Sequence, residues 1–159
     1  MTDLELQNAI IQEIRTLLKH QSLKKLNGEA WKDLNVYRQE KPYKDDTNDE
    51  LQEDYILVAL GDEDMEENGD GRWVVTLHII ICLSNEDPEN QENIALANLM
   101  NQLDLHFRKL GYVDQKYEMQ KEAHKWFDNE HGPDYVQCDY ITKWKLPVAV
   151  HMEGIDNLL

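Results

Sequence analysis

The stretch WVVTLHIIICL, residues 73–83, carries the strongest structural signal in this sequence. Side chains of a strand point alternately to its two faces. One face of this stretch is wholly apolar and carries Trp73, Val75, Leu77, Ile79, Ile81 and Leu83. The other face is mostly apolar and carries Val74, Thr76, His78, Ile80 and Cys82. We therefore expect a central strand that is covered on both sides.

The segment before this strand predicts a helix and a hairpin. Thr2 and Glu5 have the spacing of a capping box, and an apolar stripe at helical spacing follows them. Asn27 and Gly28 are typical of a helix end, so the helix is expected over residues 3–26. An apolar run at 55–60 predicts a strand that pairs with 73–83 across the acidic loop 61–71.

The second half of the chain predicts another helix and two more strands. Asp87 and Pro88 suit the start of a helix, and Gly111 suits its end. Strands are expected at 117–127 and 135–146, and a short one near Val36. The strand at 135–146 alternates between an apolar face and a polar face that includes Asp139.

These elements predict an α+β fold, with a mostly antiparallel sheet of four to five strands packed by two long helices. We expect a single domain over 1–159. Its parts are the N-terminal helix at 3–26, the sheet and second helix at 34–147, and a C-terminal tail at 148–159.

The charge balance limits the classes of partner. Sixteen Lys and Arg face thirty-two Asp and Glu, a formal net charge of -16. Such a field repels phosphates, so we expect no specific binding of nucleic acid. The longest apolar run, 79–83, is too short to span a bilayer, and we expect no membrane partner and no signal peptide. Cys82 and Cys138 are expected to be buried free thiols in a reducing cytosol.

No motif of a known catalytic centre occurs, and the six histidines show no metal-ligand spacing. We expect no enzyme and no cofactor. The acidic loop resembles a calcium-binding EF-hand loop at Asp64, Glu66 and Asp70, but the twelfth position is Val75 instead of Glu. A weak cation site is one alternative and a solvated hairpin tip is the other. The candidate ligands are Asp62, Asp64, Glu66 and Asp70.

Contacts between proteins are the remaining kind of site. Tryptophan and tyrosine are favoured anchors at subunit boundaries, and a charged loop can steer a partner. The candidate interaction residues are Asp64, Glu66, Glu67, Asp70, Trp126 and Tyr135.

The order of elements and a few aromatic and proline positions resemble a known family. From residue 34 to 150, a short strand, a hairpin, a helix and two strands follow one another. The last part carries Trp126, Pro133, Tyr135, Trp144 and Pro147. This layout resembles the tail terminator proteins of long-tailed phages and prophages.

The resemblance implies a structural assembly protein that forms a ring, expected to be a hexamer, at the head-proximal end of the tail tube. The ring would end polymerisation of the tube and join the tail to the neck. The implied partners are copies of the chain itself, the tail tube protein, and a neck or head-completion protein. The implied location is the virion tail, after assembly in the host cytoplasm.

Two features depart from many members of that family: the polar segment 41–53 and the very acidic hairpin loop. They leave open whether the tail is flexible or contractile. Two alternatives are kept. One is another head–tail joining or neck protein, and the other is an acidic regulator that mimics DNA and binds a basic protein.

Overall fold

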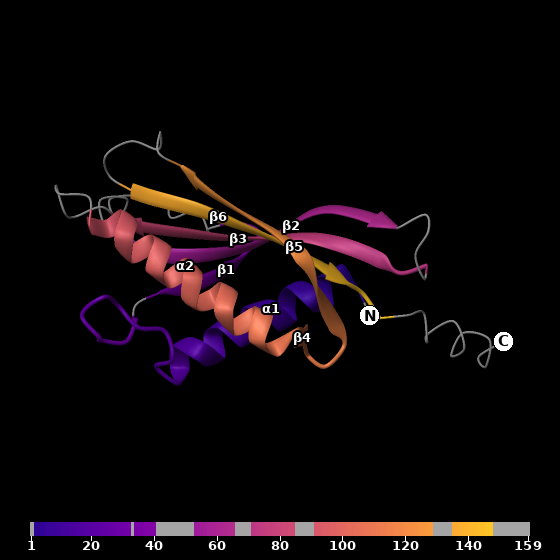
Figure 1. The fold of residues 1–159 in the computed structure, drawn as a ribbon, viewed down its shortest axis with the longest axis horizontal. Helices are drawn as coiled ribbons and strands as arrows, with labels where there is room; N and C mark the ends of the chain where they lie inside the picture. The colour runs from indigo at the N-terminus through magenta and orange to yellow at the C-terminus, as the bar shows by residue number, and fades with distance from the viewer. Residues whose placement is uncertain are drawn as a thin grey trace.

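Two helices and six strands make up the fold (Figure 1). The computed structural model describes residues 2–32, 34–40, 53–65, 71–84, 91–128 and 135–147. In chain order the elements are α1 (Asp3–Lys19), β1 (Asn35–Arg38), β2 (Tyr55–Met65), β3 (Trp73–Ser84), α2 (Gln91–Leu110), β4 (Tyr112–Val113), β5 (Tyr117–Asp128) and β6 (Tyr135–Lys145). The expected N-cap Asp87, the turn with Pro133 and the tail 148–159 lie outside the described residues.

The strands form one sheet in the order β1-β2-β3-β6-β5-β4. All neighbours pair antiparallel except β1 and β2, which are parallel. The α+β class and the mostly antiparallel sheet are therefore confirmed, but the expected four to five strands were too few. The missed strand is β4, because two residues are too short for any periodicity to reveal.

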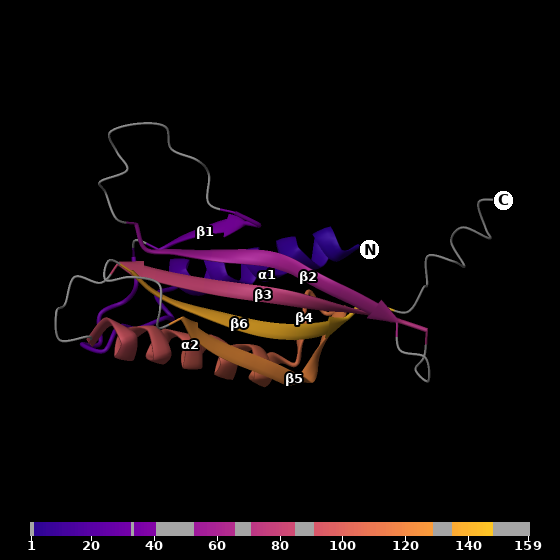
Figure 2. The same ribbon diagram turned by 90° about the horizontal axis from the view of Figure 1, so that it is seen from above.

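Both helices pack on the same face of the sheet, as the two views in Figures 1 and 2 show. One core cluster joins residues of α1 and α2 to the odd-numbered side chains of β3 from Val75 to Leu83. Across the helix pair, Nε2 of His106 lies 2.7 Å from Oε1 of Glu13. The expectation that β3 is covered on both sides is not met by the described helices, although Val74 and Cys82 on its second face are buried. On its other face Thr76, His78 and Ile80 are only half-buried, and no described helix lies over them.

Helix α1 begins as expected and ends earlier than expected. The hydroxyl of Thr2 accepts a hydrogen bond from the amide of Glu5, which confirms the N-cap. The helix stops at Lys19 instead of residue 26 because Gln21 adopts a left-handed conformation, with φ of 58°. The amide of Ser22 then bonds to the carbonyl of Leu17, a closing pattern that is usually built on glycine.

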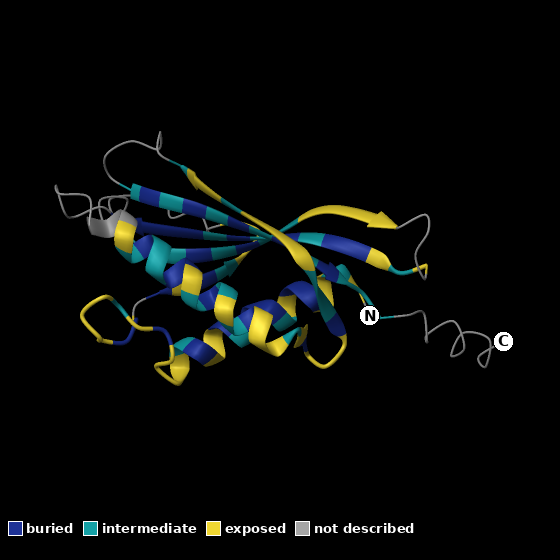
Figure 3. Cartoon of the chain, in the orientation of Figure 1, coloured by how far each residue is buried: buried dark blue, intermediate teal, exposed yellow. Residues whose placement is uncertain are grey.

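The hairpin of β2 and β3 extends beyond the helices (Figure 1). The register of β2 shifts by one residue between Leu60 and Glu63, which marks a β-bulge. Residues 61–65, which follow the start of this bulge, are all exposed, and Trp73 at the start of β3 is exposed as well (Figure 3). We call residues Gly61–Met65 the β2 arm. No helix in the described part of the chain is long and apolar enough to cross a membrane.

Candidate functional site

The sheet face that points away from the helices, called here the open face, carries no helix among the described residues. The register places Leu57, Ile80, Asp139 and Trp126 in one row across four strands. The next row is Ala59, His78, Ile141 and His124. Neighbours in such rows share one face of the sheet. The centre of the open face is therefore mainly apolar, with a few polar side chains among the apolar ones.

His78 and Asp139 form the best-defined polar contact on the open face. Nδ1 of His78 lies 2.8 Å from Oδ2 of Asp139 and 3.1 Å from Oδ1. The side chains are 28% and 18% exposed, so the pair is partly shielded from water. A carboxylate that holds one imidazole nitrogen fixes the ring orientation and leaves the other nitrogen for a second partner. Sequence reasoning placed both residues on strands but found no signal for their pairing, because 61 positions separate them.

The other ring nitrogen of His78 faces the backbone of Gly61 at the bulge. A Cβ added to Gly61 would lie 2.8 Å from Nε2 of His78 and 3.3 Å from Cγ2 of Thr76. Only glycine allows the ring to pack this closely on β2. No local pattern links this glycine to His78, because the glycine was expected in a loop and the histidine on a strand.

We expect Gly61→Ala to lower the free energy of unfolding by about 1 kcal/mol, because the new methyl group must displace an imidazole that Asp139 holds in place. Urea denaturation of four proteins measures this: wild type, Gly61→Ala, His78→Ala and the double variant. In the His78→Ala background the same glycine substitution should cost clearly less. Equal costs in the two backgrounds would show that the ring does not press on Gly61.

The acidic residues proposed as a cation site are only partly described. Asp62 and Asp64 are exposed on the β2 arm, while Glu66, Glu67 and Asp70 lie outside the described residues. Within the part that the structure describes, no group of three His, Cys, Asp or Glu side chains is arranged to hold a metal ion. The cation site therefore stays a prediction.

Asp64 lines a recess of about 500 Å³ on the open face, opposite basic residues of β5 and β6. Lys121, Lys143 and Glu122 share this recess, and Nζ of Lys143 lies 3.0 Å from Oε2 of Glu122. The recess places the end of the β2 arm and Lys121 of β5 on the same side of the sheet. Sequence reasoning had no means to bring together segments from opposite halves of the chain.

Glu63, on the β2 arm, points toward the start of α1. Although the residue as a whole is exposed, desolvation of its carboxyl by neighbouring atoms raises the pKa of that group above the ordinary 4.5, and the nearby carboxylate of Asp3 adds to the rise. The folded protein therefore binds this proton more tightly than the unfolded chain does. The folded protein therefore loses stability as the pH rises from the unfolded-state pKa of Glu63 through its higher folded-state pKa, and this loss persists at neutral pH.

We expect Glu63→Gln to raise the melting temperature at pH 7, because it removes a repelled negative charge beside Asp3. The difference from wild type should shrink as pH falls below 4.5, where the unfolded chain also binds the proton. Thermal melts between pH 3 and 8 measure it. Asp62→Asn is the matched control, because it removes the same charge from an exposed neighbour. Identical pH profiles for the two variants would contradict the contact with Asp3.

The outer edge of β5 is the second exposed feature. Strand β4 pairs only with Tyr117 and Glu118, and the amide of Met119 bonds to the carbonyl of Gly111. Beyond that point no described strand pairs with this side of β5. Residues 121–124 are exposed, as are Trp126 and Phe127, with 52% and 37% of their surface (Figure 3). We call residues Lys121–Asp128 the β5 edge.

The two predicted aromatic anchors differ in their surroundings. Trp126 pairs with Asp139, on the open face, and is half exposed. Tyr135 lies four residues before Asp139 on the same face of β6, pairs with Ser84 and is half-buried. The two residues therefore share a face but not a row, and only Trp126 belongs to the exposed edge.

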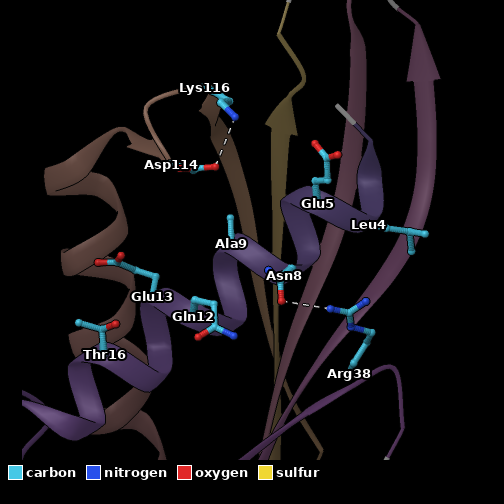
Figure 4. A pocket seen from close by; sticks show the side chains of 10 residues that line it. All are labelled: Leu4, Glu5, Asn8, Ala9, Gln12, Glu13, Thr16, Arg38, Asp114 and Lys116. Atoms are coloured by element: carbon cyan, nitrogen blue, oxygen red, sulfur yellow. Dashed lines mark hydrogen bonds and ion pairs between the residues drawn. The ribbon is translucent and has the colours of Figure 1, made fainter.

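A further recess of about 750 Å³ lies along α1, between β1 and the turn that follows β4 (Figure 4). Nη2 of Arg38 donates to Oδ1 of Asn8 over 3.2 Å at one side, and Lys116 and Asp114 form an ion pair of 3.7 Å at the other. Acidic and basic side chains are mixed around it, and Leu4 is exposed in its wall. Its lining shows no preference for one ligand charge.

Cys82 and Cys138 are buried free thiols, as expected. They occupy neighbouring strands, where Cys82 pairs with Gln137 and Cys138 with Ile81, so they lie on opposite faces of the sheet. Burial and, to a smaller extent, the nearby carboxylate of Asp139 together raise the pKa of the Cys138 thiol to about 12. This group therefore stays protonated and unreactive at neutral pH.

No known family model matches the chain, and none of the curated proteins matches it significantly.

Proposed function

We propose that this chain is a structural assembly protein of a phage or prophage tail. In this proposal, copies of the chain form a ring that ends polymerisation of the tail tube and joins the tail to the neck. The observation that carries it is the β5 edge, which no described strand pairs with on its outer side and which exposes two aromatic side chains, Trp126 and Phe127. Such an edge is a template for pairing with another chain.

The arrangement of the sheet supports self-association into a ring. The β2 arm and the β5 edge lie toward opposite margins of the sheet, so they are different surfaces. Contacts between two different surfaces of identical subunits run head to tail. They produce a closed ring when the rotation from each subunit to the next leads back to the first subunit. The element order from β1 to β6 is also the order on which the resemblance to tail terminators rests.

The net charge supports a role beside a DNA channel. A tail conduit must let DNA pass without holding its phosphates, and a charge of -16 repels them. The same charge also supports an alternative, an acidic regulator that mimics DNA and binds a basic protein. The exposed β2 arm, with Asp62, Glu63 and Asp64 and no basic residue, is the observation that favours this alternative.

Deleting the gene from its prophage and imaging the induced particles tests the proposal. Tails of irregular or excessive length are expected, since nothing would stop the tube from growing. Tails of normal length that lack heads would instead indicate a different head–tail joining protein. Normal, complete particles would contradict a role in the tail. In that case salt-sensitive capture of a basic DNA-binding protein would support the regulator.

A further inference from the structure

The two margins of the sheet differ in how their backbone groups are used. At the β1 margin, Nη2 of Arg15 donates to the carbonyl of Val36 over 2.9 Å. Next to it, the side chain of Gln39 accepts the amide of Leu60 over 2.7 Å, and the amide of Gln39 donates to Val58. At this margin, hydrogen-bonding groups of β1 and of β2 as far as Leu60 are therefore bonded to two side chains and one backbone amide. The β2 arm is the stretch of this margin that they leave open.

The β5 edge is the corresponding open stretch at the other margin. Its register with β6 is regular from Ala123 to Asp128, since the irregularity of this strand falls between Met119 and Ala123. Bulges and short lengths are two of the features that protect sheet edges from pairing, and this run of the β5 edge has neither of them. Trp126 and Phe127 add exposed aromatic surface of the kind that anchors protein contacts.

The two open stretches differ in charge, since the first is acidic and the second carries both basic and acidic side chains. The β2 arm carries Asp62, Glu63 and Asp64 and no basic residue. The β5 edge carries the basic residues Lys121, His124 and Lys125 and the acidic residues Glu122 and Asp128. Glu122 is paired with Lys143, and Nζ of Lys125 lies 3.9 Å from Oδ2 of Asp104, so Lys121 and His124 are the basic groups that a partner can meet. Two copies of the acidic arm repel each other, so the arm is suited to a basic edge and not to its own kind.

We propose that the β2 arm of one copy pairs with the β5 edge of the next copy, so that their sheets continue into one another. Because β2, β3, β6 and β5 alternate in direction, a head-to-tail repeat that keeps the strand direction sets these two strands antiparallel. Asp64 and His124 both lie on the open face, so the pairing brings acidic and basic side chains together on one side. This inference rests on the proposed self-association and names the surfaces that carry it.

Charge reversal on each stretch separately tests the pairing. The edge variant carries Lys121→Glu with His124→Glu, and the arm variant carries Asp62→Lys with Asp64→Lys. Each alone should weaken self-association by about tenfold or more, because like charges then meet at the contact. Analytical ultracentrifugation with negative-stain imaging measures it, and circular dichroism checks folding. Lys32→Glu with His20→Glu, at exposed positions in other parts of the chain, is the control for the edge variant, because it makes the same change in charge.

An equimolar mixture of the two variants is the decisive measurement. The lysines of the arm variant then meet the glutamates of the edge variant, and both wild-type stretches meet each other. The mixture should assemble as strongly as wild type, although neither variant does so alone. Asp64 and Lys121 also line one recess within a single copy. Mixing the variants cannot restore a contact within one copy, so recovered assembly reports contacts between copies.

The outcomes separate this inference from the proposed function. If wild type assembles and both variants assemble equally well, or if the mixture is not restored, these two surfaces do not meet, and the proposal of a ring stands without them. If wild type stays monomeric at all concentrations and on tail tubes, the proposed ring and this pairing fall together.

Discussion

Replacing Trp144 with alanine is expected to lower the free energy of unfolding by about 4 kcal/mol. Trp144 is fully buried in β6, and its ring meets that of Phe107 from α2 edge to face at 5.8 Å. Its Nε1 donates to Oγ1 of Thr142 over 2.8 Å, so the polar tip of the ring is also satisfied inside the core. Truncation leaves a cavity between sheet and helix and removes this contact.

Urea denaturation measures the loss, and the melting temperature should fall by about 10 °C in a chain of this size. Trp126→Ala is the matched control, because the same substitution falls on a side chain that is 52% exposed. Its effect on stability should stay within about 0.5 kcal/mol. If the two variants lost equal stability, the assignment of Trp144 to the core and of Trp126 to the surface would be wrong.

Replacing Gln39 with alanine is expected to cost about 2 kcal/mol of stability, the second largest effect. Oε1 of Gln39 accepts two hydrogen bonds of 2.7 Å, from Nε2 of Gln7 and from the amide of Leu60. Gln7 is wholly buried in α1, and its Nε2 also donates to the carbonyl of Val58. The glutamine side chain thus joins α1 to the margin of the sheet, where β1 ends.

Two further variants separate the hydrogen bonds of Gln39 from its backbone strain, since its φ is 66°. Gln39→Gly loses the bonds but tolerates this φ, so it should cost less than alanine by up to about 1 kcal/mol. Gln39→Glu keeps an acceptor at the same place and should remain close to wild type. Hydrogen exchange of the Leu60 amide should accelerate in the alanine and glycine variants. Unchanged exchange there would contradict the bond from Leu60.

Part of the candidate site could be predicted from the sequence. Trp126 was a candidate anchor for protein contacts, Asp62 and Asp64 were expected in an acidic hairpin loop, and Asp139 was expected on a polar strand face. Their exposure follows from local alternation and from the density of charge. The contacts of His78 with Asp139 and Gly61, and the recess that Asp64 shares with Lys121, join distant segments. No local pattern encodes them.

The sequence by itself determined where strand β3 and helix α1 begin, and which side chains of β3 and β6 share a face. These follow from capping chemistry and from the two-residue repeat of a strand, which are local properties. Only the tertiary structure decided that both helices pack on one face, that β1 joins in parallel, and that β5 keeps an open edge. Ile80 and His78 look like core residues in a strand pattern. They stay half exposed because coverage of a face depends on where the connections carry the helices, and that choice is made by the packing of the whole chain.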